Sequence, residues 1–313
     1  MKNFIKKSAK DWKYVCNVWK TLGWSRKQAK SYVLANMAER AFNHYENVFN
    51  YEKQHRVDKW LKTNKDGYYF DFGQGGKLPD IRENPEKYRT FGQWVFDDSL
   101  LIPVLHKNNF SHEFVRKMDA IMVEGPYGFT DGDFDVRVAL GDIVIDAGAW
   151  IGDFSCYASA QGAAIIYAFE PSTDNFTWLE RTAQLNNNII PVKKGLGSKH
   201  ETTMFECNNN NSGMNRCTEN EKKETEPVEI VTLDEYVESN GITKLDFIKS
   251  DIEGAEREML RGAKNTLRRL SPKLALCTYH LPDDPEVMAS IILESNPRYK
   301  IVQLRHKLFA AVI

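Results

Sequence analysis

Residues 141–152 read GDIVIDAGAWIG, and the organisation of the second half of the chain follows from them. A short apolar strand over 143–145 ends in Asp146, and a glycine-containing turn leads into a helix expected over 152–161. Gly148 lets backbone approach a ligand without a Cβ in the way, and Gly152 lets the helix start close to the strand. The pattern is D-x-G-x-x-x-G instead of the dinucleotide fingerprint G-x-G-x-x-G, with an acid where a phosphate would be repelled. The turn therefore suits a ligand with a cationic or hydroxyl-rich end.

Strands and helices alternate from this turn to the end of the chain. The further strands expected are 163–170, 189–194, 228–233, 244–251 and 273–280, and the further helices expected are 173–187, 255–269 and 285–294. This alternation predicts an α/β fold with a doubly wound, Rossmann-like parallel sheet. The last two strands, 299–304 and 307–313, are expected to form an antiparallel edge hairpin around Arg305–His306. In such sheets ligands bind beyond the carboxyl ends of the strands.

A second acidic residue stands at the end of the next strand. Glu170 closes the strand over 163–170, and a carboxylate there can accept hydrogen bonds from the vicinal hydroxyls of a ribose. A nucleoside with a charged sulfonium amino acid in place of phosphates suits both Asp146 and Glu170, which predicts S-adenosylmethionine as the cofactor. The alternative is that the two carboxylates only cap the helices that follow them.

Four segments carry a family resemblance: VIDAGAWIG, AFEPSTDNF, TLDEY and LDFIKSDIEGAEREMLRGA. Together they resemble the FkbM family of S-adenosylmethionine-dependent methyltransferases over roughly residues 120–313. The resemblance implies a seven-stranded methyltransferase sheet and O-methylation, often of sugars or other hydroxyl-bearing natural products. Carbohydrate modification is therefore the expected activity.

The resemblance also implies a set of cofactor contacts. These are Asp146, Gly148 and Gly152 at the methionine end, Glu170 at the ribose, Pro171, Ser172 and Asn175 in the loop beneath it, and Gly195 and Leu196 near the adenine. Asp251, at the end of the strand over 244–251, is a candidate from its position for catalysis and for a contact with the methionine end. Trp150 departs from the family pattern, because many relatives carry a polar residue such as Asn there. Its indole is expected to stack on the cofactor or to fill space beside it.

Methyl transfer to a hydroxyl needs alignment and help with the proton. Holding the acceptor oxygen in line with the methyl carbon and the sulfur supplies much of the acceleration. A sugar hydroxyl is a poor nucleophile, so a general base is expected at a strand end beside the cofactor. We assign His280 as the base or as a group that orients the acceptor, because histidine titrates near neutrality. Glu253 would orient the acceptor, or alternatively stabilise the start of the helix after it.

Two carboxylates and a histidine could also hold Mg²⁺ or Mn²⁺. The residues concerned are Asp251, Glu253 and His280. The sequence gives no sign that their side chains converge, so the predicted site contains no metal.

The first 110 residues differ in character from the remainder. Residues 1–65 hold 15 Lys and Arg against 5 Asp and Glu, and an apolar stripe from Trp12 to Leu22 has helical spacing. We therefore expect a basic, mainly helical N-terminal region over 1–110, with a looped connector from about residue 66 to 109, and a methyltransferase domain over 111–313. The basic helices could suit a phosphorylated or nucleotide-linked acceptor, or contact with a membrane surface. A homo-oligomer is a further hypothesis, as is simple docking of this region on the acidic domain.

The overall composition fits a soluble globular chain. The hydrophobic share is 42%, the charged share is 27% and the net charge is -1. No apolar run approaches the roughly 20 residues of a membrane span, and no apolar stretch follows the basic start as in a secretion signal. Five cysteines are few and odd in number, which favours a reducing cytoplasm. The polar stretch 207–227 is expected to form a lid or a surface hairpin, with Asn211, Ser212 and Asn215 as candidate glycan contacts.

Three other function classes compete with a sugar O-methyltransferase. A nucleic-acid methyltransferase would use the basic N-terminal region on phosphates, but SDIE stands after the fourth strand where such enzymes often carry a D/N-P-P-Y tetrapeptide. A non-catalytic binding module is disfavoured by the acids at three strand ends. An NAD oxidoreductase is disfavoured by the missing G-x-G-x-x-G fingerprint.

Overall fold

The computed structural model describes residues 61–71, 76–80, 127–206, 216–217 and 225–313. The helices expected over 1–60 lie outside these residues, as does the predicted domain boundary near residue 110. Among the helices that are described, none combines the length and the apolar character of a membrane span.

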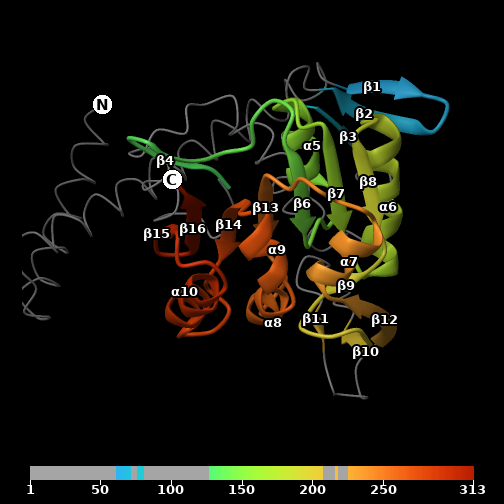
Figure 1. Ribbon diagram of the computed structural model, residues 1–313. Coiled ribbons are helices and arrows are strands. Elements are labelled where there is room, and N and C mark those ends of the chain that lie inside the picture. The colour runs from blue at the N-terminus through green and yellow to red at the C-terminus, as the bar shows by residue number, and fades with distance from the viewer. Residues whose placement is uncertain (1–60, 72–75, 81–126, 207–215, 218–224) are drawn as a thin grey trace, which may run out of the picture. The chain divides into compact units, whose positions relative to one another are not determined.

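A seven-stranded sheet forms the centre of the described chain, as the sequence predicts (Figure 1). In spatial order its strands are β15 (Tyr299–Gln303), β16 (Lys307–Val312), β14 (Lys273–Cys277), β13 (Phe247–Ser250), β6 (Ile143–Ala147), β7 (Ile165–Phe169) and β8 (Ile189–Val192). All neighbours pair in parallel except β16, which runs antiparallel between β14 and β15. The predicted hairpin of the last two strands is therefore confirmed, although β16 lies inside the sheet and β15 forms its edge.

Helices cover both faces of this sheet. They are α5 (Asp153–Ala160), α6 (Thr173–Leu185), α7 (Leu233–Ser239), α8 (Glu256–Arg261), α9 (Lys264–Arg269) and α10 (Asp284–Ser295). One apolar cluster contains Phe154 from α5 and Leu179 from α6, and a second contains Met259, Leu267 and Met288 from α8, α9 and α10. The sheet is therefore doubly wound, with a core on each side.

The helix predicted over 255–269 is in fact two helices. Gly262 lies between α8 and α9, and a Cβ added to it would overlap the carbonyl oxygen of Gly197. The carbonyl of Gly262 also accepts a hydrogen bond from the amide of Asp234, at 2.9 Å, at the start of α7. This close approach of three chain segments breaks the helix, and a helical period alone does not reveal it.

A second, four-stranded sheet lies between β8 and β13 along the chain. Its order is β11 (Arg216–Cys217), β10 (Glu201–Glu206), β12 (Thr225–Val231) and β9 (Gly195–Leu196). The strand expected over 228–233 exists as β12, but it pairs with β9 and β10 and so belongs to this side sheet, not to the central one. The glycan contacts suggested for Asn211, Ser212 and Asn215 fall outside the described residues.

Two small antiparallel units precede the central sheet. Strands β1 (Leu61–Asn64), β2 (Gly67–Asp71) and β3 (Lys77–Pro79) form one sheet. The looped connector expected from about residue 66 is therefore wrong for β2 and β3. Both backbone polar groups of Lys77 bond to the side chain of Asn186 just beyond α6, at 3.2 and 2.7 Å. The hairpin of β4 (Phe129–Asp131) and β5 (Phe134–Val136) packs on the central sheet through the stacked rings of Phe129 and Phe309, whose centroids lie 5.4 Å apart.

Candidate functional site

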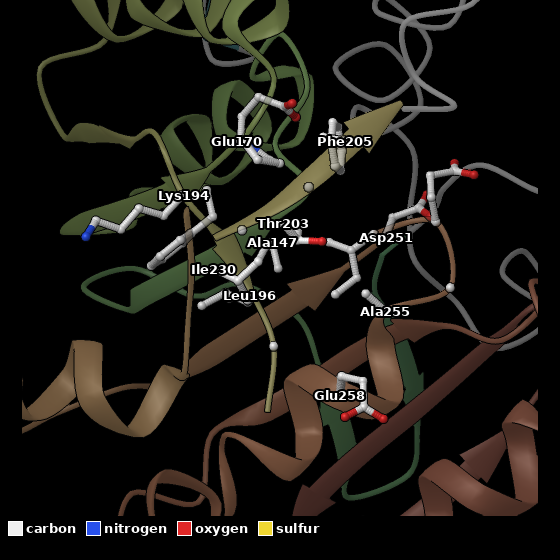
Figure 2. A pocket seen from close by; sticks show the side chains of 18 of the residues that line it. Ala147, Glu170, Lys194, Leu196, Thr203, Phe205, Ile230, Asp251, Ala255 and Glu258 are labelled. Carbon is white, nitrogen blue, oxygen red and sulfur yellow. The ribbon is translucent and has the colours of Figure 1, made fainter. Parts of the chain in front are cut away.

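A cavity of about 510 Å³ opens at the carboxyl ends of β6, β7 and β13 (Figure 2). This volume falls in the range of small-molecule and cofactor sites. The sequence-predicted residues that line it are Gly148, Trp150, Glu170, Pro171, Asn175, Gly195, Leu196, Asp251 and Glu253. The parallel sheet brings these residues together from segments that are more than 100 positions apart.

The turn after β6 forms the floor of the cavity. Gly148 has a φ of 72°, and a Cβ added to it would lie 2.9 Å from the carbonyl carbon of Asp251 and closer still to the oxygen. The turns after β6 and β13 therefore touch at Gly148, as only glycine permits. Trp150 also has a positive φ, 49°, and its amide donates to Glu170 Oε2 at 3.0 Å.

Asp146 lies behind this floor and is fully buried. It does not line the cavity; instead its Oδ1 pairs with Lys249 Nζ at 3.1 Å and its Oδ2 accepts a hydrogen bond from Ser155 Oγ at 2.6 Å. Lys249 Nζ also donates to the carbonyl of Gly148 at 2.7 Å. Burial by itself lowers the pKa of Lys249, but the charges of Asp146, Asp251 and Asp153 raise it above its ordinary value, so the side chain is a cation.

Lys249 was missed by the sequence analysis, and it changes the electrostatics of the site. Because a buried cation lies beside Asp146, the negative charge at the end of β6 is neutralised. The ammonium group instead binds the glycine turn and the acid together beneath the cavity. A single lysine in the apolar strand FIKS was the available signal.

Gly152 and Ser172, also predicted, act through the backbone near the cavity. A Cβ on Gly152 would lie 2.9 Å from Thr182 Cγ2, so this glycine allows α5 to begin close to α6. The amide of Ser172 donates to Glu170 Oε1 at 3.0 Å.

Glu170 is held firmly at the end of β7. Its Oε1 also accepts from Asn175 Nδ2 at 3.3 Å, and the whole residue is 5% exposed. Burial raises the pKa of Glu170 to about 7, although the hydrogen bonds from Ser172, Asn175 and Trp150 lower it. The carboxylate lines the cavity in a fixed orientation, which is what binding a ligand hydroxyl requires.

Asp251, Glu253 and His280 converge at the other side of the cavity floor. His280 Nε2 lies 3.8 Å from Asp251 Oδ1 and 3.6 Å from Glu253 Oε2, and Nδ1 lies 3.3 Å from Glu256 Oε1. One ligand atom from each of the first three residues lies within 4.8 Å of the others, which fits a metal site geometrically. Asp251 is oriented by hydroxyl donors, Tyr127 to Oδ2 at 2.8 Å and Tyr279 to Oδ1 at 2.9 Å.

His280 itself does not line the cavity, and its surroundings do not suit a free base. Burial lowers the pKa of His280, but its interactions with Glu253, Glu256 and Asp251 outweigh burial and raise it to about 10. With no metal bound, the ring is therefore an imidazolium at neutral pH, whereas the base role assumed an ordinary histidine pKa.

The side sheet supplies a wall that the sequence analysis did not predict. Thr203 and Phe205 from β10 and Ile230 from β12 line the cavity, together with Lys199 and Glu201 at its edge. In Figure 2, Phe205 and Glu170 lie on one side of the space and Ala255 and Glu258 on the other. The remaining lining residues are Ala147, Phe169, Lys194, Gly197, Ser198, Ile252 and Gly254.

Comparison with known proteins gives one match to a family and several to individual proteins. Residues 146–304 match the Methyltransferase FkbM domain. Over 164 residues the chain is 29% identical to the hexuronic acid methyltransferase AglP of Haloferax volcanii, which covers 52% of this chain and 66% of AglP. Over 194 residues it is 27% identical to the methyltransferase sdnD of Sordaria araneosa, covering 51% of this chain and 74% of sdnD.

The solved structures are more distant. A methyltransferase FkbM from Methylobacillus flagellatus KT is 20% identical, with a TM-score of 0.46 over 74% of this chain and 60% of that one. Fibrillarin from Aeropyrum pernix, solved with bound S-adenosyl-L-methionine, is 12% identical, with a TM-score of 0.35 over 58% of this chain and 70% of that one. The matched part therefore spans less than two thirds of AglP and of the crystallised FkbM methyltransferase, and the assignment to a family comes from the sequence match.

Proposed function

Because this chain belongs to the FkbM methyltransferase family, we propose that it transfers a methyl group from S-adenosylmethionine to a hydroxyl of a saccharide or sugar-linked metabolite. The supporting observation is a single cavity that joins the fixed carboxylate of Glu170 to the cluster of Asp251 and Glu253 across a glycine floor. A hydroxyl-rich nucleoside suits the first end, and an acceptor hydroxyl suits the second.

The chain's own residues suit this cofactor. Glu170 accepts hydrogen bonds from the ribose hydroxyls, and the backbone of Gly148, which lines the cavity, faces the methionine part over the turn after β6. Leu196, Phe205 and Ile230 offer apolar surface to the adenine ring. When bound, the cofactor supplies a methyl group on a sulfonium, which is already activated for displacement.

The acceptor end relies on alignment and on the carboxylates. Asp251 and Glu253 line the cavity, so in this proposal they hold the acceptor hydroxyl in place. His280 lies behind them, 3.8 and 3.6 Å from the two carboxylates, so the direct contact with the acceptor expected from the sequence is not part of this proposal. A sugar acceptor is supported by the name of one relative, the hexuronic acid methyltransferase AglP.

Incorporation of labelled methyl groups tests the acceptor class. The protein is incubated with S-adenosylmethionine labelled in its methyl group and with free hexuronic acids, nucleotide sugars, oligosaccharides, RNA and a catechol. We expect label in at least one saccharide and none in RNA or the catechol. Label only in RNA or the catechol would overturn the saccharide assignment.

Binding of S-adenosylhomocysteine, measured by calorimetry, tests the cofactor end separately. Glu170→Ala should weaken binding at least tenfold, since it removes the acceptor of two ribose hydrogen bonds. Glu180→Ala, on the exposed side of α6, is the matched control and should bind as the wild type does. Equal affinity in the two variants would contradict the placement of the ribose at Glu170.

A further inference from the structure

The imidazole of His280 has an unusual position between two carboxylates. Nε2 lies 3.6 Å from Glu253 Oε2 and 3.8 Å from Asp251 Oδ1, whereas N–H···O hydrogen bonds span about 2.7–3.2 Å. Both ring nitrogens are buried and make no hydrogen bond within the part of the chain that the structure describes. Two neighbouring ligands at about 2.1 Å from one octahedral ion lie about 3.0 Å apart. The observed spacing is longer than a hydrogen bond and leaves room for a cation, towards which the three side chains would close by about 0.6–0.8 Å.

From this geometry we propose that Asp251, Glu253 and His280 bind a divalent cation, Mg²⁺ or Mn²⁺, through Oδ1, Oε2 and Nε2. The binding site stands on these residues alone. Its catalytic role, holding the acceptor hydroxyl, rests on the proposed function.

The opposite side of the ring supports this assignment. Nδ1 lies 3.3 Å from Oε1 of Glu256, which is fully buried. The carboxylate of Glu256 is fixed by the amides of Ile252, at 2.8 Å, and Gly254, at 3.1 Å. A histidine that binds a metal usually donates its other N–H to a carboxylate, which fixes the tautomer and the ring orientation. Glu256 lies on that side of the ring, 3.3 Å from Nδ1 but without a formed hydrogen bond, and Nε2 faces the two ligand oxygens.

The two carboxylates are also positioned by their surroundings. The Tyr127 and Tyr279 hydroxyls hold Asp251 from two directions. Glu253 has a φ of 54°, a left-handed conformation that costs a non-glycine residue roughly 1–2 kcal/mol. Such strain is typical of sites where the backbone must aim a particular side chain. Here it turns the Glu253 carboxylate towards His280 while one side still faces the cavity.

The set of donors selects the kind of ion. Two carboxylate oxygens and one imidazole nitrogen, without a thiolate, suit Mn²⁺ and Mg²⁺ better than soft metals. Three protein ligands leave coordination positions for water and for a hydroxyl. A divalent cation lowers the pKa of a hydroxyl that it binds, which answers the need for activation at the acceptor end. In the balanced reaction the O–C bond forms, the C–S bond breaks with its electron pair left on sulfur, and the hydroxyl proton passes to water.

Manganese titration of the full chain tests the site without any methyl transfer. Protein treated with EDTA and then dialysed is titrated with MnCl₂, and free Mn²⁺ is measured by electron paramagnetic resonance. We expect one Mn²⁺ per chain, with affinity at least tenfold weaker in His280→Ala and in Glu253→Gln. Glu256→Gln, which alters the support of the ring and of the turn that carries Glu253, should weaken binding about 10–100-fold.

His200 provides the matched control, because its ring also contacts two carboxylates. Its nitrogens lie 3.1 Å from Glu229 and 3.2 Å from Glu235, at ordinary hydrogen-bond distances on an exposed surface. His200→Ala should bind Mn²⁺ as the wild type does. Binding of S-adenosylhomocysteine by each variant verifies that the variant is folded. Glu253→Gln changes one atom in a partly exposed side chain, so this variant still tests the metal site if His280→Ala fails to fold.

The outcomes separate this proposal from the proposed function. Absence of stoichiometric Mn²⁺ binding, or equal affinity in wild type and Glu253→Gln, overturns the metal site, and methyl transfer that EDTA does not affect overturns its catalytic role. In the first case a buried histidine among three carboxylates is what remains. Stoichiometric binding without methyl transfer to any saccharide supports the metal site and counts against the saccharide acceptor.

Discussion

Gly148→Ala should separate the two turns that form the cavity floor. The added Cβ would lie 2.9 Å from the Asp251 carbonyl carbon and closer to the oxygen, while ordinary contact begins at 3.4 Å. The turn after β13 must therefore retreat by about 1 Å, and a displacement of that size can reduce a reaction rate about 100-fold. The positive φ adds a cost of about 1 kcal/mol, and forced repacking adds about 1–3 kcal/mol. We expect about 100-fold slower methyl transfer and at least tenfold weaker binding of S-adenosylhomocysteine.

Gly141→Ala separates the contact from the backbone conformation. Gly141 has a φ of 83°, similar to the 72° of Gly148, but an added Cβ would meet no heavy atom of the described residues within 4 Å. This variant should lose about 1 kcal/mol of unfolding free energy and keep its cofactor affinity. Both proteins are compared by urea unfolding and by calorimetry with S-adenosylhomocysteine. If the two variants lose stability equally and both retain affinity, contact between the two turns does not control the cavity.

Two further predictions concern buried charges. Burial raises the pKa of Glu170 from 4.5 to about 7. The ionised side chain therefore lowers the free energy of unfolding, and this loss of stability grows as the pH rises from 4.5 to 7. Urea unfolding at pH 5 and pH 8 should therefore show Glu170→Gln gaining up to about 3 kcal/mol relative to wild type at the higher pH, and a pH-independent difference would contradict this. Lys249→Met leaves Asp146 buried without its cation and should cost about 3–5 kcal/mol, whereas adding Asp146→Asn should recover part of that loss. Additive losses in a urea double-mutant cycle would show that the pair is not coupled.

The sheet and part of the site could be predicted because their signals are local. Ile143 to Ile145 and the similar runs that follow are short and apolar, with a helical period between them, so the order of strands and helices could be read along the chain. Glu170 and Asp251 stand directly after strands, and parallel strands place their carboxyl ends at one edge. Gly148 was predicted for the same reason.

The rest depends on contacts that no local pattern encodes. Lys249 becomes a structural cation only because β13 lies beside β6, which brings it to Asp146 about 100 residues away. The pKa of His280 is lowered by burial and raised to a greater extent by Glu253, Glu256 and Asp251, and all of these causes arise from the folded structure. Phe205 lies in a strand whose other residues are mostly exposed, so the alternation that would identify a buried face is weak.

Two separate chain segments form opposite sides of the cavity, so changes in one side can arise without changes in the other. Residues 195–205 with Ile230 contribute the side-sheet wall, and residues 251–255 contribute the opposite corner. Residues 195–231 and residues 251–255 lie outside the strands of the central sheet, so either stretch could be exchanged by grafting without altering those strands. If the proposed function holds, a chimera that receives the 251–255 turn of a relative changes its acceptor preference while it keeps Glu170 at the nucleoside end.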